Sequence, residues 1–377
     1  MISYAAALLV DRGIIGLDHD VNDYIGFTLR HPQHLSTVIT LRMLLTHMSS
    51  INDAAEWYSR PLLCVRGDSA LSNGDWLHTY LTESGQYYGG VDNINGSWFD
   101  KKPGHSYAYS NEGASLAALV AERMPQRAGL ISSDERVSDL VRRFVFAPLG
   151  VAKHDAVSYF LRDLPSSPSE LQHPTALYPG RPHLRALEEY FVYDYPEYPC
   201  GRWMASPRDQ AALLISFINN GTSPGLPPLL NASTVEEMRR PQPTVRGADP
   251  QVKEGQGLIW YYREQAGRRL LGHNGCDYGT STDMFFNPDT GAGFLVATSA
   301  DCESDAVWAA EEAIENAILD AMEGRSRDAT GSRPGAESMK MRRRSRGGRG
   351  QSSSDHPSIC DDKIAAKTLG PCWWLCD

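Results

Sequence analysis

The sequence predicts an α+β fold in which an antiparallel sheet flanked by helices is joined to a separate helical region. Three observations favour this class. Before about Gly255 the apolar residues recur mainly at helical spacing, after it four short segments have the composition of strands, and an amphipathic helix pattern follows them. Because helices come first and strands come together later, two layers containing an antiparallel sheet are expected.

The first predicted helix covers Ile2 to Asp11, which is apolar nearly all round and stops at Gly13. Such a segment is typical of a buried helix that ends at a glycine with a left-handed backbone. Thr40 is placed to cap a short helix that follows it. From Asn52 to Gly104 the composition indicates loops, apart from a short amphipathic piece at 76–81.

Two further helices are indicated by their start signals. Asn111 can cap a helix whose apolar residues continue to Val120. Ser206-Pro207 opens another, because serine is a good cap and proline fits the first helical position, and Asn220-Gly221 ends it. Both segments are therefore predicted to be helical.

Four strands are predicted after Gly255, separated by turn residues such as Gly267 and Gly291. They cover residues 257–262, 269–272, 283–287 and 293–298. The helix that follows has an apolar face suited to packing on the sheet, formed by Val307, Ala310, Ile314, Ala317, Ile318 and Ala321.

These elements predict one domain over residues 1–323, with a helical region over about 14–254 and the sheet and closing helix over about 255–323. Residues 324–377 are rich in arginine, serine and glycine, which predicts a disordered tail. The net charge of −10 includes this basic tail, so the folded body is more acidic than the total. An acidic body argues against nucleic-acid binding, since such binding needs clustered Lys and Arg.

The seven cysteines show no series of CxxC pairs and no Cys/His spacing typical of zinc sites. Neither a metal nor a cofactor is therefore expected, while one or two disulfides stay open. No apolar run approaches the roughly 20 residues needed to cross a bilayer, so no membrane span is expected. The sequence leaves the localisation open.

Two short segments carry residue types suited to catalysis: Tyr109-Ser110-Asn111 at a helix start and Gly272-His273-Asn274-Gly275 at the end of a strand. Each alone is more often structural. A tyrosine commonly packs in a core, an asparagine commonly caps a helix, and a histidine at a strand end is commonly a packed residue. Their functional interpretation therefore depends on the segments around them.

Five segments, in order, resemble successive landmarks of one family: residues 9–13, 18–24, 39–47, 103–113 and 272–279. The family is the serine beta-lactamase-like hydrolases, which include class C beta-lactamases, D-alanyl-D-alanine peptidases and related esterases. The resemblance extends from about Met1 to Met322 and implies a beta-lactamase/transpeptidase-like fold. The two N-terminal strands of that fold are missing from this sequence, so the sheet is expected without them. Because those strands cover the last strand of the sheet in the family, the resemblance implies that residues 293–298 form an exposed edge here.

The chemistry of the family implies roles for particular residues. A serine and a lysine one helical turn apart (SxxK) attack a carbonyl and accept a proton, while a YxN element and a KTG or HxG strand complete the site. The resemblance places Tyr109 at the base and His273 at the strand Lys/His position. It assigns Asn111 and Gly275 to substrate binding and the backbone N–H of Cys276 to the oxyanion hole.

The sequence departs from the family at the nucleophile. Counting back from Val10 places the lysine and the serine before Met1, and Ser3 is not followed by a lysine three residues later. We therefore expect a serine hydrolase-like acyl-transfer protein of esterase, beta-lactamase or D-Ala peptidase type, inactive as written. The expected partner is a small-molecule ester, lactam or peptide substrate.

Two alternatives stay open. One is a noncatalytic paralogue that keeps the cleft and binds a small ligand or a partner protein, and the other is an unrelated helix-plus-sheet protein. An in-frame stretch ending in SxxK before Met1 favours the hydrolase, whereas a stop codon there favours the paralogue. The substrate cannot be named from the sequence, because hydrophobic pockets discriminate poorly between similar esters and amides.

Overall fold

The structure is a computed structural model that describes residues 1–54, 65–151, 157–163, 175–176, 188–189, 193–242, 255–277, 280–300 and 305–324. Its helices are α1 (Ile2–Asp11), α2 (Asn22–Ile25), α3 (Leu41–Leu45), α5 (Asn73–Leu81), α6 (Asn111–Arg127), α7 (Val137–Val141), α8 (Pro207–Ile218), α9 (Ala232–Arg239) and α10 (Asp305–Glu323). Short helical turns are η1 (Arg142–Phe146), η3 (Leu161–Asp163) and η5 (Tyr198–Cys200). Its strands are β1 (Val65–Arg66), β2 (Thr175–Ala176), β3 (Glu188–Glu189), β4 (Tyr193–Asp194), β5 (Tyr261–Gln265), β6 (Arg268–Asp277), β7 (Thr280–Phe286) and β8 (Gly293–Thr298).

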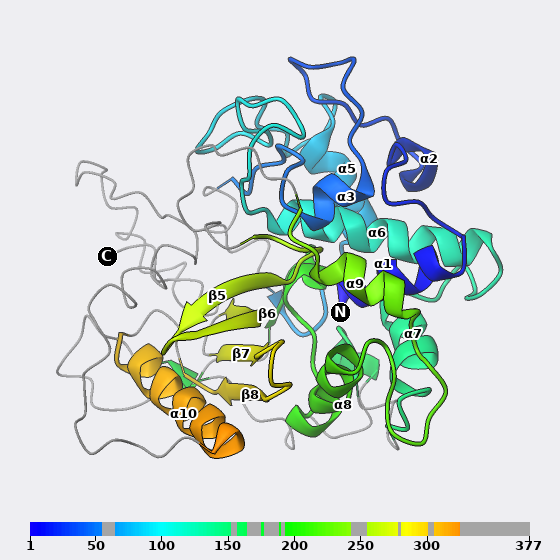
Figure 1. The fold of residues 1–377 in the computed structure, drawn as a ribbon. Coiled ribbons are helices and arrows are strands. Elements are labelled where there is room, and N and C mark those ends of the chain that lie inside the picture. The colour runs from blue at the N-terminus through cyan, green and yellow to red at the C-terminus, as the bar shows by residue number, and fades with distance from the viewer. Residues whose placement is uncertain are drawn as a thin grey trace.

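The main sheet is antiparallel throughout, with the strand order β5-β6-β7-β8. In Figure 1, α10 lies along one side of this sheet, and most of the other helices gather on the opposite side. The antiparallel sheet flanked by helices and the separate helical region confirm the predicted α+β class. Strand β8 pairs only with β7 in the described sheet and is an edge there, as predicted.

Only the last predicted strand, 293–298, agrees with the observed strand at both ends. The second and third were predicted too short, because β6 continues to Asp277 and β7 already begins at Thr280, so His273 lies within β6 and not at the end of a strand.

The first strand was misplaced. Residues before Tyr261 do not continue the strand, because Ile259 has a left-handed backbone with φ of 71°. The N–H of Ile259 instead donates to the carbonyl of Leu45 at 2.6 Å, which joins this segment to α3. The turn at 266–267 has positive φ at both positions, which suits a tight hairpin and lets β6 begin directly after it.

Helix α1 is buried along most of its length, and Gly13 follows it with φ of 68°, as predicted. Two hydrogen bonds connect this helix to distant parts of the chain. The Tyr4 hydroxyl donates to the carbonyl of Leu213 on α8 at 3.3 Å, and the indole N–H of Trp260 donates to the Ser3 hydroxyl at 3.0 Å. Helix α1 therefore joins the helical region to the segment leading into β5.

The helix starts follow the expected cap chemistry, with one correction. Thr40 and Ser206 each accept an N–H from the residue three positions later, at the starts of α3 and α8. At the start of α6 the cap is Ser110, whose hydroxyl accepts the N–H of Gly113 at 2.8 Å. The prediction that Asn111 caps this helix was wrong by one residue, because a cap needs a non-helical backbone and Asn111 is already helical.

Two hydrophobic cores lie on opposite faces of the sheet. The larger core extends from the helices to the inner face, where it includes Leu271 and Phe286. The smaller core lies between the sheet and α10 and includes Leu270, Phe285 and Leu319. Neighbouring residues of β6 and of β7 enter different cores because successive side chains of a strand point to opposite faces.

Helix α10 does not pack on the sheet through the whole apolar face predicted for it. Val307 is buried, as predicted, but Ile314 is 48% exposed, and Ala310 and Ala321 are also exposed. The prediction was therefore wrong for these three residues.

Acidic side chains of α10 face the sheet instead. Glu311 accepts a hydrogen bond from the Ser281 hydroxyl at 3.0 Å, and Glu315 pairs with Arg263 at 2.9 Å. The side chains of both Glu311 and Glu315 are buried. The orientation of α10 is set by polar groups on the outer face of the sheet, which an apolar periodicity in the sequence does not reveal.

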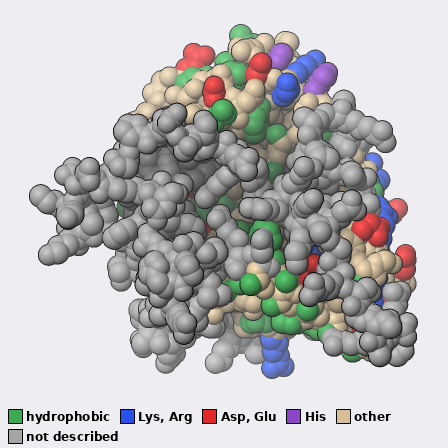
Figure 2. Space-filling view, turned by 90° about the vertical axis from the view of Figure 1, so that its left-hand side faces the viewer, with side chains coloured by type: hydrophobic (Ala, Val, Ile, Leu, Met, Phe, Trp, Pro, Cys, Tyr) green, Lys and Arg blue, Asp and Glu red, His purple; other side chains and the backbone are tan. Residues whose placement is uncertain are grey.

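The described surface on the face shown in Figure 2 carries scattered rather than gathered Lys and Arg side chains. Among the described residues, no helix combines the length and the apolar character needed to cross a membrane. The predicted domain boundaries stay a prediction. The predicted tail lies outside the described residues, apart from Gly324.

Candidate active site

Tyr109, Ser110 and Asn111 lie at the start of α6, where the carboxylate of Asp53 holds the backbone. This carboxylate accepts hydrogen bonds from the Ser110 hydroxyl at 2.9 Å, the Asn111 N–H at 2.6 Å and the Glu112 N–H at 3.0 Å. A carboxylate also suits the positive end of the helix dipole. Sequence reasoning missed Asp53, because one aspartate in a loop-rich stretch carries no sign of the distant segment that it positions.

His273 lies on β6 beside a tyrosine of β5. Its ring contacts the ring of Tyr261 edge-on, with 5.6 Å between the centroids, and the Tyr261 hydroxyl donates to the side-chain oxygen of Asn274 at 2.8 Å. Burial lowers the pKa of His273 to about 4, and the positive amino group of Met1 also lowers it. His273 is therefore neutral near pH 7 and lies near the start of α1.

His47 connects the two predicted segments. Its imidazole packs against the ring of Tyr109 with 4.4 Å between the centroids. Burial lowers the pKa of His47 to about 3, and the charge of His273 contributes to this lowering. A backbone hydrogen bond also brings the two segments together. The N–H of Ile259, two residues before β5, donates to the carbonyl of Leu45, two residues before His47. The structure thus brings Tyr109 and His273 into one region.

Gly275 and Cys276 continue β6 beyond His273. A Cβ at position 275 would lie 2.5 Å from Oγ1 of Thr282 on β7, so a larger residue there would require the Thr282 side chain to shift. Cys276 is exposed, lies opposite Ser281 and is disulfide-bonded. The expected contacts of Gly275 and Cys276 with a substrate stay a prediction.

The surroundings of Tyr109 are acidic. Burial and the neighbouring groups of Cys200 and Asp53 raise the pKa of its hydroxyl, although 38% of the residue is exposed. Burial also raises the pKa of Glu112 and raises the pKa of Glu197 to about 8. A tyrosine that acts as a base needs a lowered pKa. In these surroundings Tyr109 keeps its proton and is a hydrogen-bond donor.

No SxxK motif occurs in the 377 residues, since none of the seven lysines follows a serine by three positions. Ser3 and Ser110, which are buried, have structural partners in Trp260 and Asp53. Burial raises the pKa of the Cys200 thiol, which disfavours the reactive thiolate. None of these three groups is arranged as an activated nucleophile.

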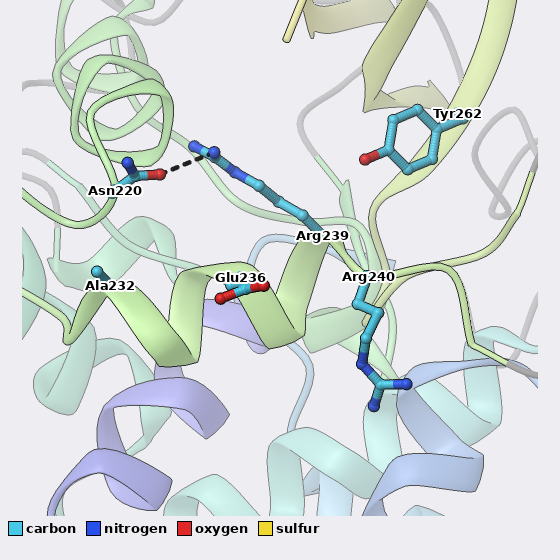
Figure 3. A pocket seen from close by; sticks show the side chains of 6 residues that line it. All are labelled: Asn220, Ala232, Glu236, Arg239, Arg240 and Tyr262. Carbon is cyan, nitrogen blue, oxygen red and sulfur yellow. Dashed lines mark hydrogen bonds between the residues drawn. The ribbon is translucent and has the colours of Figure 1, made fainter.

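A cavity of about 410 Å³ lies between α8, α9 and the start of β5, away from the predicted site residues. Figure 3 shows Arg239 extending toward Asn220, to which it donates a hydrogen bond of 2.9 Å, while Arg240 points away. The cavity is lined by Asn220, Ala232, Glu236, Arg239, Arg240 and Tyr262. Over the described ranges, no three His, Cys, Asp or Glu side chains are grouped to hold a metal ion.

The fold is that of penicillin-binding and amide-hydrolysing proteins. The penicillin binding protein from Bacillus halodurans is 20% identical, with a TM-score of 0.57, 83% of this chain covered and 82% of that chain. D-amino acid amidase from Ochrobactrum anthropi SV3, complexed with L-phenylalanine amide, is 19% identical, with a TM-score of 0.61, 87% of this chain covered and 82% of that chain. D-stereospecific amidohydrolase from Streptomyces sp. is 19% identical, with a TM-score of 0.55, 85% of this chain covered and 83% of that chain.

These identities are low, so the likeness to solved structures shows the fold alone. The fold is the one that serine hydrolase-like acyl-transfer proteins adopt. The sequence profile described as Beta-lactamase matches residues 1–316. The chain belongs to the Beta-lactamase family, which confirms the resemblance and the predicted beta-lactamase/transpeptidase-like fold. A search of curated proteins found no match to the chain.

Proposed function

We propose that the region around Tyr109 and His273 is an acyl-transfer-type site that binds the carbonyl group of a small ester, lactam or amide. In this proposal Tyr109 and His273 lie at the reacting centre, and Asn111 orients the ligand. The observation that carries it is the packing of His47 against Tyr109, together with the effect of His273 on the pKa of His47. The ring contact joins two segments that lie far apart in the sequence.

Strand β6 supplies the other side of the proposed site. The absence of a side chain at Gly275 leaves the backbone accessible to an extended ligand, and the N–H of Cys276 is the proposed oxyanion donor. The amidase with a similar fold was solved with L-phenylalanine amide, so phenylalanine amides are the first ligands to test.

The 377-residue chain is proposed to bind such ligands without becoming acylated. Two observations support this part: SxxK is absent from the sequence, and the pKa of the Tyr109 hydroxyl is raised rather than lowered. The same observations favour the second candidate function, a noncatalytic protein that keeps the cleft for a small ligand or a partner protein. The two candidates differ in whether a chain extended by SxxK before Met1 hydrolyses the ligand.

Treating the purified chain with a fluorophosphonate, and separately with benzylpenicillin, is expected to leave its intact mass unchanged. The physical reason is that no serine of the chain has a lysine one helical turn away to accept its proton. Mass spectrometry of the whole protein measures this directly, with a known penicillin-binding protein as the positive control. Stoichiometric labelling of any serine would contradict the proposal and would identify a different nucleophile.

A further inference from the structure

A second cavity, of about 360 Å³, lies beside the C-terminal end of α6, next to the start of α5 and the segment that leads into α7. Helix α6 packs against α2, α5 and α7 (Figure 1). The described residues that line the cavity include Arg123 and Arg127 of α6 and Arg136 directly before α7. Since each helical residue adds about 1.5 Å, Arg123 lies about 18 Å along α6 from Asn111. The cavity is therefore separate from the proposed carbonyl site.

The wall of this cavity carries more positive than negative charge. Among its described lining residues Glu122 is the one carboxylate, and its Oε1 lies 3.9 Å from Nη1 of Arg136. That distance is too long for a hydrogen bond. Within the described part of the chain, no ion pair joins Arg123 or Arg127 to an acidic side chain. One carboxylate can neutralise at most one of three guanidinium groups, so positive charge is in excess here, although the net charge of the chain is −10.

Backbone carbonyls of α2, rather than carboxylates, hold two of the arginines. Nη1 of Arg123 donates to the carbonyl of Ile25. Nη1 of Arg127 donates to the carbonyl of Asp23 at 3.0 Å. Both guanidinium groups lie against Gly26, because a Cβ there would overlap Nη1 of Arg123 and would lie 3.6 Å from Nη2 of Arg127. Like charges four residues apart on a helix repel each other, so a bound anion beside them would stabilise the pair.

Nη2 of Arg123 lies beside the start of α5. A Cβ added to Gly74, which lines the cavity, would lie 3.2 Å from this nitrogen. No described residue accepts a hydrogen bond from it. Gly74 is the second residue of α5, and the first N–H groups of a helix have no acceptor within the helix. Asp75 does not line the cavity, and its carboxylate accepts the Ser72 hydroxyl at 2.6 Å. The cavity wall thus offers Arg123 donors at the positive end of a helix dipole, which suits an anion.

We propose that this cavity binds a phosphate-type oxyanion, either free phosphate or the phosphate group of a small molecule, with Arg123, Arg127 and Arg136 as its cationic ligands. A planar guanidinium group presents paired donors that match phosphate oxygens. Three arginines and one glutamate leave two positive charges in excess, which a phosphate group with a charge of about −1.5 to −2 balances. Small-molecule sites have volumes of about 300–1,000 Å³, and this cavity is at the small end of that range.

The first test titrates the full chain with inorganic phosphate at pH 7 and fixed ionic strength in a calorimeter. Saturable binding of one phosphate per chain is expected. Arg123→Gln and Arg136→Gln are each expected to weaken it roughly ten- to a hundredfold, because each removes a hydrogen bond between charged groups. The matched control is Arg240→Gln, which removes an exposed arginine that pairs with Glu237 and lines the other cavity. This variant is expected to bind phosphate as the parent does.

Glu122→Gln tests the proposal in the opposite direction. It removes the negative charge from the cavity wall and is expected to bind phosphate roughly two- to fivefold more tightly, the worth of one partly exposed charge pair. Glutamine keeps an oxygen for the N–H of Val137, which Glu122 accepts at 3.2 Å. A gain in affinity cannot come from a damaged fold, so this variant decides the matter even if Arg123→Gln does not fold. Thermal unfolding without phosphate shows which variants are folded.

Glycerol 3-phosphate distinguishes the two sources of the phosphate group. If it binds more tightly than inorganic phosphate, the ligand is the phosphate group of a small molecule, and if it binds more weakly, the ligand is free phosphate. Both results support the proposal. The absence of saturable phosphate binding to the parent, or the same phosphate affinity in the parent, Arg123→Gln, Arg136→Gln and Glu122→Gln, would overturn it. The proposed carbonyl site is tested separately with amide ligands, so either site can fail without the other.

Discussion

Replacing Arg268 by leucine is expected to lower the free energy of unfolding by about 3 kcal/mol, because it removes one partner from a buried ion-pair group. The Arg268 side chain is 2% exposed and pairs with Glu323 at 2.8 Å and Asp320 at 2.5 Å. Glu323 is itself 5% exposed and would keep its charge near the sheet without this cation. Denaturant unfolding of the purified chain measures the change.

The control for this substitution is Arg240→Leu. Arg240 also pairs with a glutamate, Glu237 at 2.7 Å, but its side chain is 50% exposed. An exposed pair contributes about 0–1 kcal/mol, so this variant should unfold almost as the parent does. If Arg268→Leu lowers the free energy of unfolding by no more than Arg240→Leu does, polar pairing does not hold α10 on the sheet.

Replacing Glu197 by glutamine is expected to remove a large part of the pH dependence of stability between pH 4.5 and 8. Glu197 is 5% exposed, and one carboxyl oxygen, Oε2, has no hydrogen-bond partner among the described residues. Burial, together with the charges of Asp53 and Asp277, raises the pKa of Glu197 from 4.5 to about 8. The folded state therefore holds a proton through a window in which the unfolded chain has lost it.

The sign follows from proton linkage. A folded-state pKa above the unfolded value gives stability that is fully present below pH 4.5 and is lost as the pH rises through about 8. Between these pH values the free energy of unfolding of the parent is expected to fall by on the order of 3 kcal/mol more than that of Glu197→Gln, because the glutamine side chain cannot ionise. Glu236 is exposed, so the stability of Glu236→Gln should depend on pH as that of the parent does. Parallel profiles for the parent and Glu197→Gln would show that Glu197 is ionised in the folded protein.

Local signals in the sequence predicted the elements whose formation depends on neighbouring residues. Helix α1 and strand β8 lie where expected, because an apolar run ending at Gly13 and a short apolar run after a turn specify them locally. The order of the landmark segments predicted the family, since several weak motifs in one order are specific together. The predicted roles of Tyr109 and His273 rest on the same order of segments and stay predictions.

Features that depend on distant partners were not predicted. The acidic face of α10 is buried because the sheet offers it Ser281 and Arg263, which the helix sequence does not reveal. The role of Asp53 in holding the start of α6 depends on a contact between separate segments. His47 was part of a landmark, but its contact with the N–H of Ser110 depends on a segment far away in the sequence.

The central claim, that Tyr109, Asn111 and His273 form one ligand site, is tested most directly by a crystal structure of the chain with phenylalanine amide bound. The account predicts the amide between the start of α6 and β6, with the Asn111 side chain and the N–H of Cys276 within about 3 Å of its polar atoms. Ligand bound only in the cavity beside Arg239, or His273 far from Tyr109, would contradict the account.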